Sequence, residues 1–161
     1  MTNKILNLLN ENPRLTDKEL AVMLNMSEKE VSDEIARLEN DGIIGGYRAI
    51  IDWNRVEECD SVTALIELKV SPRRDTGFDE IAAEILEFPE VETVHLMSGA
   101  YDFAVYVKAR TMQDIAMFVA RRISTLDSVL STATHFVLKS YKDSGVVLTG
   151  KEEDERRLIT F

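Results

Sequence analysis

The chain has 161 residues, 45% of them hydrophobic and 30% charged, with a formal net charge of −10 at pH 7. This composition is ordinary for a folded globular protein, and no apolar run is long enough to span a bilayer, so we expect a cytoplasmic protein without a membrane partner. A single cysteine excludes an internal disulfide framework, and we expect no cofactor or metal. The acidic balance argues against strong nonspecific binding to nucleic acid, because DNA affinity comes largely from neutralising phosphates.

Three short amphipathic helices are predicted before Gly42, where the third one ends. The first stops before Pro13, because proline disfavours helical geometry in the residue that precedes it. The second starts at Thr16 and the third at Ser27, each followed three residues later by a glutamate, which is the spacing of a capping box. Two capped helices joined by a turn of about three residues are typical of a helix-turn-helix, here over about 16–39.

A pair of glycines after the third helix indicates a two-stranded wing. Residues 43–51 are largely apolar on both sides of Gly45 and Gly46, which supply the turn of a short hairpin. A winged helix-turn-helix over residues 1–52 is therefore the favoured interpretation, and a plain three-helix bundle is the alternative. The polar, acidic stretch 53–60 is interpreted as a linker.

From residue 61 the pattern changes to short strands separated by helices. Strands are expected at 61–70, 91–97, 102–109 and 129–139, and helices at 76–88 and 111–126. The order β-α-β-β-α-β is that of the ferredoxin-like fold, with both helices on one face of an antiparallel sheet. The expected fold class is thus α+β, with this domain over 61–142 and a C-terminal extension over 143–161.

The sheet face opposite the helices is unusually apolar. The residues that the strand alternation assigns to this face are Leu65, Val94, Leu96, Ala104, Tyr106, Ala133, His135 and Val137. A solvated face of an antiparallel sheet normally carries polar residues. We therefore expect this face to pack against a second copy, and the resulting homodimer would present two helix-turn-helix units to successive half-sites on DNA.

Several motifs occur together in a characteristic order. They include Ile35-Ala-Arg-Leu-Glu39, Gly42-Ile-Ile-Gly-Gly-Tyr-Arg48, Pro89-Glu-Val91, Ser98-Gly-Ala-Tyr-Asp102 and Thr132-Ala-Thr134. With these motifs the chain resembles the leucine-responsive and asparagine-activator (Lrp/AsnC) transcriptional regulators of bacteria and archaea, from residue 4 to about 142. The resemblance implies a winged helix-turn-helix, a ferredoxin-like amino-acid-sensing domain, and dimers that assemble further into octamers.

The third helix is the candidate DNA-reading element. Its apolar residues are expected to face inward, and the exposed side then offers phosphate or base contacts, with two arginines flanking as backbone clamps. These candidate DNA contacts are Ser27, Lys29, Ser32 and Arg37, flanked by Arg14 and Arg48. An ordinary solvated helix face is the alternative interpretation of the same residues.

The charge of this region argues for weak binding by each copy. Residues 1–52 contain six basic and ten acidic residues, and Glu34 stands where the family commonly has a basic residue. Asp33 and Glu34 repel phosphate, although a carboxylate can accept a hydrogen bond from cytosine N4. We therefore expect several copies to act together, so that avidity multiplies modest contacts.

A glycine-containing turn is the candidate effector site. Gly99 lets a backbone amide approach a ligand carboxylate, and Asp102 can pair with an α-ammonium group. The full set of candidates is Ser98, Gly99, Ala100, Tyr101 and Asp102, with Thr132 and Thr134 adding hydroxyls from the last strand. The resemblance implies an effector site formed by this turn and neighbouring strands where dimers meet. Alternatively, Gly99 and Asp102 are simply hairpin residues.

The sequence predicts a DNA-binding transcriptional regulator that responds to an amino acid or related metabolite. The alternative is an effector-binding oligomer with weak or vestigial DNA binding that acts through other regulators. An enzyme is not expected, because no nucleophile with a base, phosphate loop or nucleotide fingerprint is visible. His95 and His135 lack partners at metal-ligand spacing and are interpreted as buried or interface residues.

Overall fold

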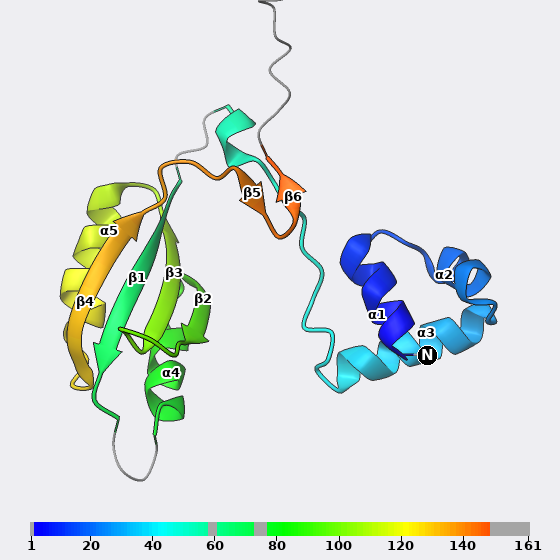
Figure 1. Cartoon of the computed structure of the whole chain (residues 1–161), viewed down its shortest axis with the longest axis horizontal. Helices are drawn as coiled ribbons and strands as arrows, with labels where there is room; N and C mark the ends of the chain where they lie inside the picture. The colour runs from blue at the N-terminus through cyan, green and yellow to red at the C-terminus, as the bar shows by residue number, and fades with distance from the viewer. Residues whose placement is uncertain (1, 58–60, 73–76, 149–161) are drawn as a thin grey trace, which may run out of the picture. The chain divides into compact units, whose positions relative to one another are not determined.

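The computed structural model describes residues 2–57, 61–72 and 77–148, and the chain forms two compact units, residues 1–51 and 52–161. Each unit has its own hydrophobic core. Within the described part of the chain, no helix has both the length and the apolarity needed to cross a membrane. Figure 1 shows the helices and strands of both units.

The first unit contains the three predicted helices, α1 (Thr2–Glu11), α2 (Asp17–Leu24) and α3 (Glu28–Asn40). Both predicted capping boxes are confirmed. The Thr16 backbone N–H donates to the carboxylate of Glu19 at 2.8 Å, and the Ser27 backbone N–H donates to that of Glu30 at 2.9 Å. Each cap satisfies backbone donors that the first turn of a helix leaves unpaired.

Packing of the three helices follows from their apolar stripes. The fully or almost fully buried residues are Ile5, Leu9, Leu20, Ala21, Val31 and Leu38, with Ile35 half-buried beside them. Asn25 adopts the left-handed conformation (φ 54°) between α2 and α3, which lets the chain make a sharp turn within three residues. The helix-turn-helix prediction is therefore confirmed, including the inward face of α3.

The predicted wing hairpin is wrong for this structure. No helix or strand is formed between Ile43 and Ile51, and Ile43 and Tyr47 are about half exposed. An isolated two-stranded hairpin is marginally stable at best, and the exposed Ile43 and Tyr47 add little buried surface to one here. The Tyr47 hydroxyl instead donates to Glu39 at 3.0 Å, so a side chain rather than a β ladder ties this segment to α3.

The second unit has the ferredoxin-like order that the sequence predicts. Its elements are β1 (Val62–Val70), α4 (Asp79–Leu86), β2 (Val91–Leu96), β3 (Phe103–Ala109), α5 (Met112–Phe118), which runs into the π-helical turn η2 (Val119–Ile123), and β4 (Val129–Phe136). The strands form one antiparallel sheet in the order β2-β3-β1-β4, visible in Figure 1 with β1 and β3 at the centre. Part of the predicted helix 76–88, residue 76, lies outside the described residues.

One face of this sheet is covered by the two helices. Ala64, Ile66 and Leu68 of β1 are fully buried against residues such as Ile85 of α4 and Ile115 of α5. The alternate residues of β1 lie on the opposite, open face. This is the period-two pattern from which the strand was predicted.

The composition of the open face differs from the prediction at β2. The pairing of β2 with β3 shifts register between Val91 and Thr93, so that Val94 and Leu96 lie opposite Val105 and Phe103 on the helix-covered face. Assigning Val94 and Leu96 to the open face was therefore wrong, because the irregularity inverts the alternation beyond it.

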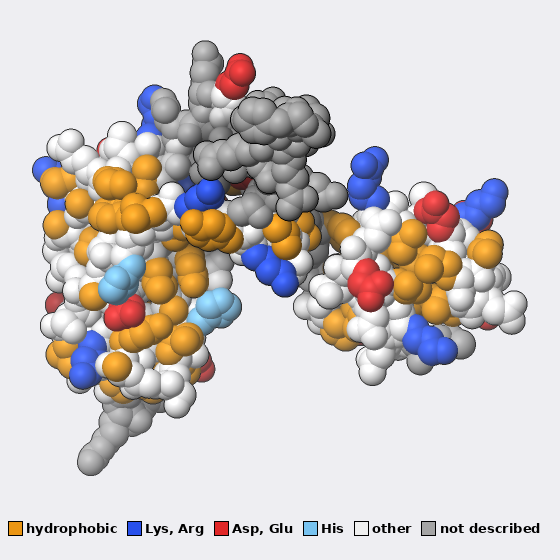
Figure 2. All heavy atoms as spheres, turned by 45° about the horizontal axis from the view of Figure 1, so that its top comes forward, with side chains coloured by type: hydrophobic (Ala, Val, Ile, Leu, Met, Phe, Trp, Pro, Cys, Tyr) orange, Lys and Arg blue, Asp and Glu red, His pale blue; other side chains and the backbone are white. Residues whose placement is uncertain are grey.

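Thr93 and His95 take the places of these two residues on the open face. They join Leu65 and Glu67 of β1, Ala104 and Tyr106 of β3, and Ala133 and His135 of β4. Figure 2 shows the two histidines of the chain among hydrophobic side chains on this surface.

Short elements flank the sheet at both ends of the second unit. The predicted linker begins with a single 3-10 turn, η1 (Trp53–Arg55), whose Trp53 ring lies 4.2 Å from the Lys108 ammonium. After β4, the strands β5 (Lys142–Asp143) and β6 (Val146–Val147) form a small hairpin. Residues 58–60 of the predicted linker and 149–161 of the predicted extension lie outside the described residues.

Candidate functional site

The exposed side of α3 carries the candidate DNA contacts but is predominantly acidic. Lys29 and Ser32 are exposed on this helix, and Arg14 and Arg48 are exposed on the segments that precede α2 and follow α3. The helix as a whole holds five acidic and two basic residues. The net negative charge of this helix therefore weakens its attraction for DNA phosphates, although a helix-turn-helix places it where DNA would bind.

The Ser27 hydroxyl, a predicted DNA contact, is engaged in the helix cap. Ser27 Oγ donates to the Glu30 carboxylate at 2.7 Å and accepts from the Glu30 backbone N–H at 3.2 Å. The hydrogen bond from the Ser27 backbone N–H, followed by that from its hydroxyl, lowers the pKa of Glu30 below its usual value. The first role of Ser27 in the free protein is thus to start α3.

Arg37, another predicted DNA contact, is held by two carboxylates of its own helix end. Its Nε and Nη2 donate to the two oxygens of Glu34 at 2.9 and 2.8 Å, and its Nη1 donates to Asp41 Oδ2 at 2.8 Å. Glu34 also accepts a hydrogen bond from the Thr2 hydroxyl of α1 at 2.7 Å. The Arg37 bonds first, and the Thr2 bond next, lower the pKa of Glu34 to about 2.

The predicted effector turn links β2 to β3, and Asp102 anchors it. Ser98, Gly99 and Ala100 are exposed, whereas Tyr101 and Asp102 are partly buried. Three hydrogen bonds fix Asp102. Its carboxylate accepts from the Val70 N–H at 2.8 Å, its own N–H donates to the Leu68 carbonyl at 2.8 Å, and its carbonyl accepts from the Met97 N–H at 2.7 Å.

Thr132 and Thr134 lie on the edge strand β4 and share the helix-covered side of the sheet. They pair with Leu68 and Ile66 of β1, and both are half-buried. Because β1 lies between β4 and β3, one full strand separates these hydroxyls from Asp102, a spacing of roughly 10 Å. The fold thus brings Thr132 to the same end of the sheet as the turn, but not into contact with it.

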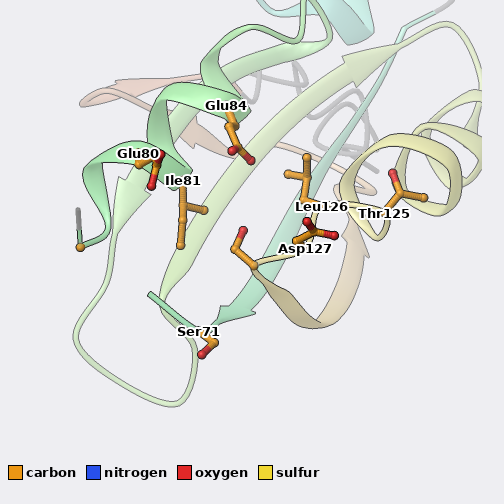
Figure 3. Close-up of a pocket in the computed structure, with 9 residues that line it drawn as sticks. Ser71, Glu80, Ile81, Glu84, Thr125, Leu126 and Asp127 are labelled. Atoms are coloured by element: carbon orange, nitrogen blue, oxygen red, sulfur yellow. The ribbon is translucent and has the colours of Figure 1, made fainter. Parts of the chain in front are cut away.

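A hollow of about 370 Å³ opens elsewhere, between α4 and the loop before β4. Its lining residues are Ser71, Gly77, Glu80, Ile81, Glu84, Thr125, Leu126, Asp127 and Ser128. Figure 3 shows Glu80 and Glu84 on the α4 side and Asp127 on the loop side. Three carboxylates make this hollow unsuitable for the carboxylate of an amino acid, and it contains no predicted effector residue.

Two family models together match most of the chain. A winged helix-turn-helix DNA-binding model matches residues 2–44, and the Lrp/AsnC ligand binding domain model matches residues 63–147. The chain belongs to the Lrp/AsnC family. It is a transcriptional regulator with an N-terminal helix-turn-helix and a ligand-binding domain, in a family of regulators rather than of enzymes.

Similarity to individual proteins extends along almost the whole chain. It is 45% identical over 157 residues to the HTH-type transcriptional regulator YugG of Bacillus subtilis (strain 168), covering 98% of this chain and 95% of that protein. Identity is 29% with a proline dehydrogenase transcriptional activator of Rhizobium radiobacter, over 89% of this chain and 90% of the activator. A Neisseria meningitidis regulator, solved as NMB0573 in complex with L-Met, has 26% identity and a TM-score of 0.68, covering 92% and 95% of the two chains.

Sequence reasoning missed the partners that hold the candidate residues of this Lrp/AsnC regulator. The spacing of Glu34 and Asp41 at three before and four after Arg37 was a visible signal, since such residues are neighbours on a helix. Two other contacts join residues that are 32 positions apart, Thr2 with Glu34 and Val70 with Asp102. No local sequence pattern predicts contacts of this kind.

Proposed function

We propose that this Lrp/AsnC regulator binds double-stranded DNA as a homodimer, or as a larger assembly such as an octamer, in the cytoplasm. The observation that carries this proposal is the open face of the sheet. Leu65 is half-buried and Tyr106 is 36% exposed, and both lie in the middle of this face. The hydrophobic core of the second unit lies on the other side of the sheet, among its described residues. A second copy would bury these side chains and bring two weakly binding helix-turn-helix units to one DNA molecule.

We further propose that a small amino-acid effector binds at the turn formed by residues 98–102, with Thr132 and Thr134 contributing from β4 of the same or a neighbouring copy. The exposed backbone of Gly99 suits a ligand carboxylate. The hydrogen bond from Val70 uses one oxygen of Asp102, so the other oxygen can accept from an ammonium group. The L-Met complex of the N. meningitidis regulator supports an amino acid as the class of ligand.

Two measurements on the full chain test these proposals. Sedimentation at micromolar concentration is expected to give a dimer or a multiple of it, and a clean monomer would overturn the assembly. A thermal-shift screen against the twenty amino acids is expected to give at least one ligand that raises the melting temperature, because a ligand that binds the native state stabilises it. No shift with any of the twenty would remove the amino-acid effector.

A second candidate function is an effector-binding oligomer that acts mainly through other regulators. The acidic surface of α3 and the engagement of Arg37 by Glu34 and Asp41 favour it. A gel shift on the DNA upstream of the protein's own coding region distinguishes the two functions. Retarded DNA at low salt supports direct regulation, whereas an amino-acid response without any retardation supports the second candidate.

A further inference from the structure

We propose that Glu34 competes with DNA phosphates for the guanidinium of Arg37. Together with Asp41 it holds the Arg37 guanidinium on the surface of α3 and so lowers the affinity of the recognition helix for phosphate. The inference rests on the proposed DNA binding and names the residue that sets its strength.

Three of the five N–H donors of the Arg37 guanidinium are engaged by carboxylates, including one whole edge. Arginine binds phosphate most strongly through two parallel N–H bonds from one edge of the guanidinium. The edge formed by Nε and Nη2 is taken by both oxygens of Glu34, and Nη1 donates to Asp41. All three guanidinium nitrogens therefore already donate to carboxylates, although the Arg37 side chain itself is 49% exposed.

Glu34 is fixed in place rather than free to swing away. Its side chain is only 21% exposed, and the Thr2 hydroxyl of α1 donates to it at 2.7 Å. Exposed ion pairs usually contribute little because two long side chains must be ordered to form them. Here one partner is already ordered by a contact between two helices, so less entropy is lost when Arg37 binds to it.

The charges around Arg37 also weaken its binding to phosphate. Arg37 contributes one positive charge, whereas Glu34 and Asp41 contribute two negative charges at the same end of α3. A phosphate that recruited Arg37 would have to displace both carboxylates and would then lie beside them. Replacing Glu34 with glutamine leaves one acceptor oxygen where there were two, so the bidentate contact with the guanidinium is lost. The same change removes a negative charge that repels phosphate.

The test is a double-mutant cycle on the full chain with Glu34→Gln, Arg37→Ala and the double variant. Binding to a mixed-sequence DNA duplex of about three helical turns is measured by fluorescence anisotropy across a salt series. Glu34→Gln is expected to tighten binding roughly three- to tenfold at about 0.1 M salt and to steepen the salt dependence by about 0.9 per copy, as one added phosphate contact does. Arg37→Ala is expected to weaken binding more in the Glu34→Gln background than in the unaltered chain.

Two further variants separate this effect from folding and from net charge. Glu11→Gln removes the same charge from an exposed position at the end of α1, and it is expected to show a smaller gain and no coupling to Arg37. Asp41→Asn leaves the contact between Thr2 and Glu34 untouched, and it is expected to tighten binding in the same direction as Glu34→Gln.

Equal effects of Glu34→Gln and Glu11→Gln would overturn the inference, as would an equal cost of Arg37→Ala in both backgrounds. If wild type and every variant fail to bind the duplex at low salt, the proposed DNA binding itself fails. Binding by all variants without coupling overturns the role of Glu34 alone.

Discussion

Replacing Asp102 with alanine tests whether this residue of the proposed effector turn also stabilises the folded second unit. The pairing of β1 with β4 shifts register between Lys69 and Val70, and the Val70 N–H is satisfied by the Asp102 carboxylate at 2.8 Å. Alanine leaves that partly buried donor without its acceptor, which costs about 1–3 kcal/mol. For a unit of about 100 residues this lowers the melting temperature by roughly 4 °C or more for each kcal/mol. Asparagine retains an acceptor oxygen, so Asp102→Asn should cost about 1 kcal/mol or less.

The assay is urea unfolding without ligand, followed by circular dichroism and by the fluorescence of Trp53, the single tryptophan of the chain, which lies in the same unit as the turn. Ser98→Ala is the matched control, because Ser98 is exposed in the same turn. It is expected to stay within about 0.5 kcal/mol of wild type. A ligand-free Asp102→Ala protein as stable as the Ser98→Ala protein would refute the structural role and leave Asp102 with ligand binding alone.

Three further predictions concern the helix cap, the acid sensitivity of α3 and the open sheet face. Ser27→Ala removes the cap of α3 and should destabilise the first unit by about 1 kcal/mol, whereas Ser32→Ala should not; equal unfolding midpoints would contradict this. The pKa of Glu34 is lowered to about 2 from its usual 4.5, so its contacts stabilise the first unit fully above pH 4.5 and are lost as the pH falls toward 2. Glu34→Gln should flatten the stability of that unit across this pH range, and an unaltered slope in acid unfolding would argue against it. Tyr106→Glu on the open face should shift sedimentation toward the monomer, while Leu86→Glu, exposed on α4, should not; assembly that survives Tyr106→Glu would exclude this face as the interface.

Features that depend on residues close in sequence were predictable. The capping boxes at Thr16 and Ser27 join residues three apart, and the strand β1 follows an alternation that is visible along the chain. Helical and strand periodicity arise from backbone geometry, so apolar spacing predicts both the elements and their buried faces. The order of these elements then leaves few topologies, and the ferredoxin-like sheet was among them.

The predictions that failed depended on pairing between segments. The hairpin at residues 43–51 had turn residues but no neighbouring strand, and the irregularity in β2 inverted the faces of Val94 and Leu96. A register is chosen by the fit of two strands to each other and to the core, so one sequence segment cannot specify it alone.

The candidate sites show the same division. Sequence alone determined that Arg37 lies on the recognition helix and that Asp102 lies in a turn between two strands. Only the tertiary structure decided what these side chains touch, because Thr2 reaches Glu34 from α1 and the Val70 N–H reaches Asp102 from β1. The charge available to a ligand depends on such contacts, since a carboxylate or guanidinium already held by a neighbour must be released before it can bind anything else.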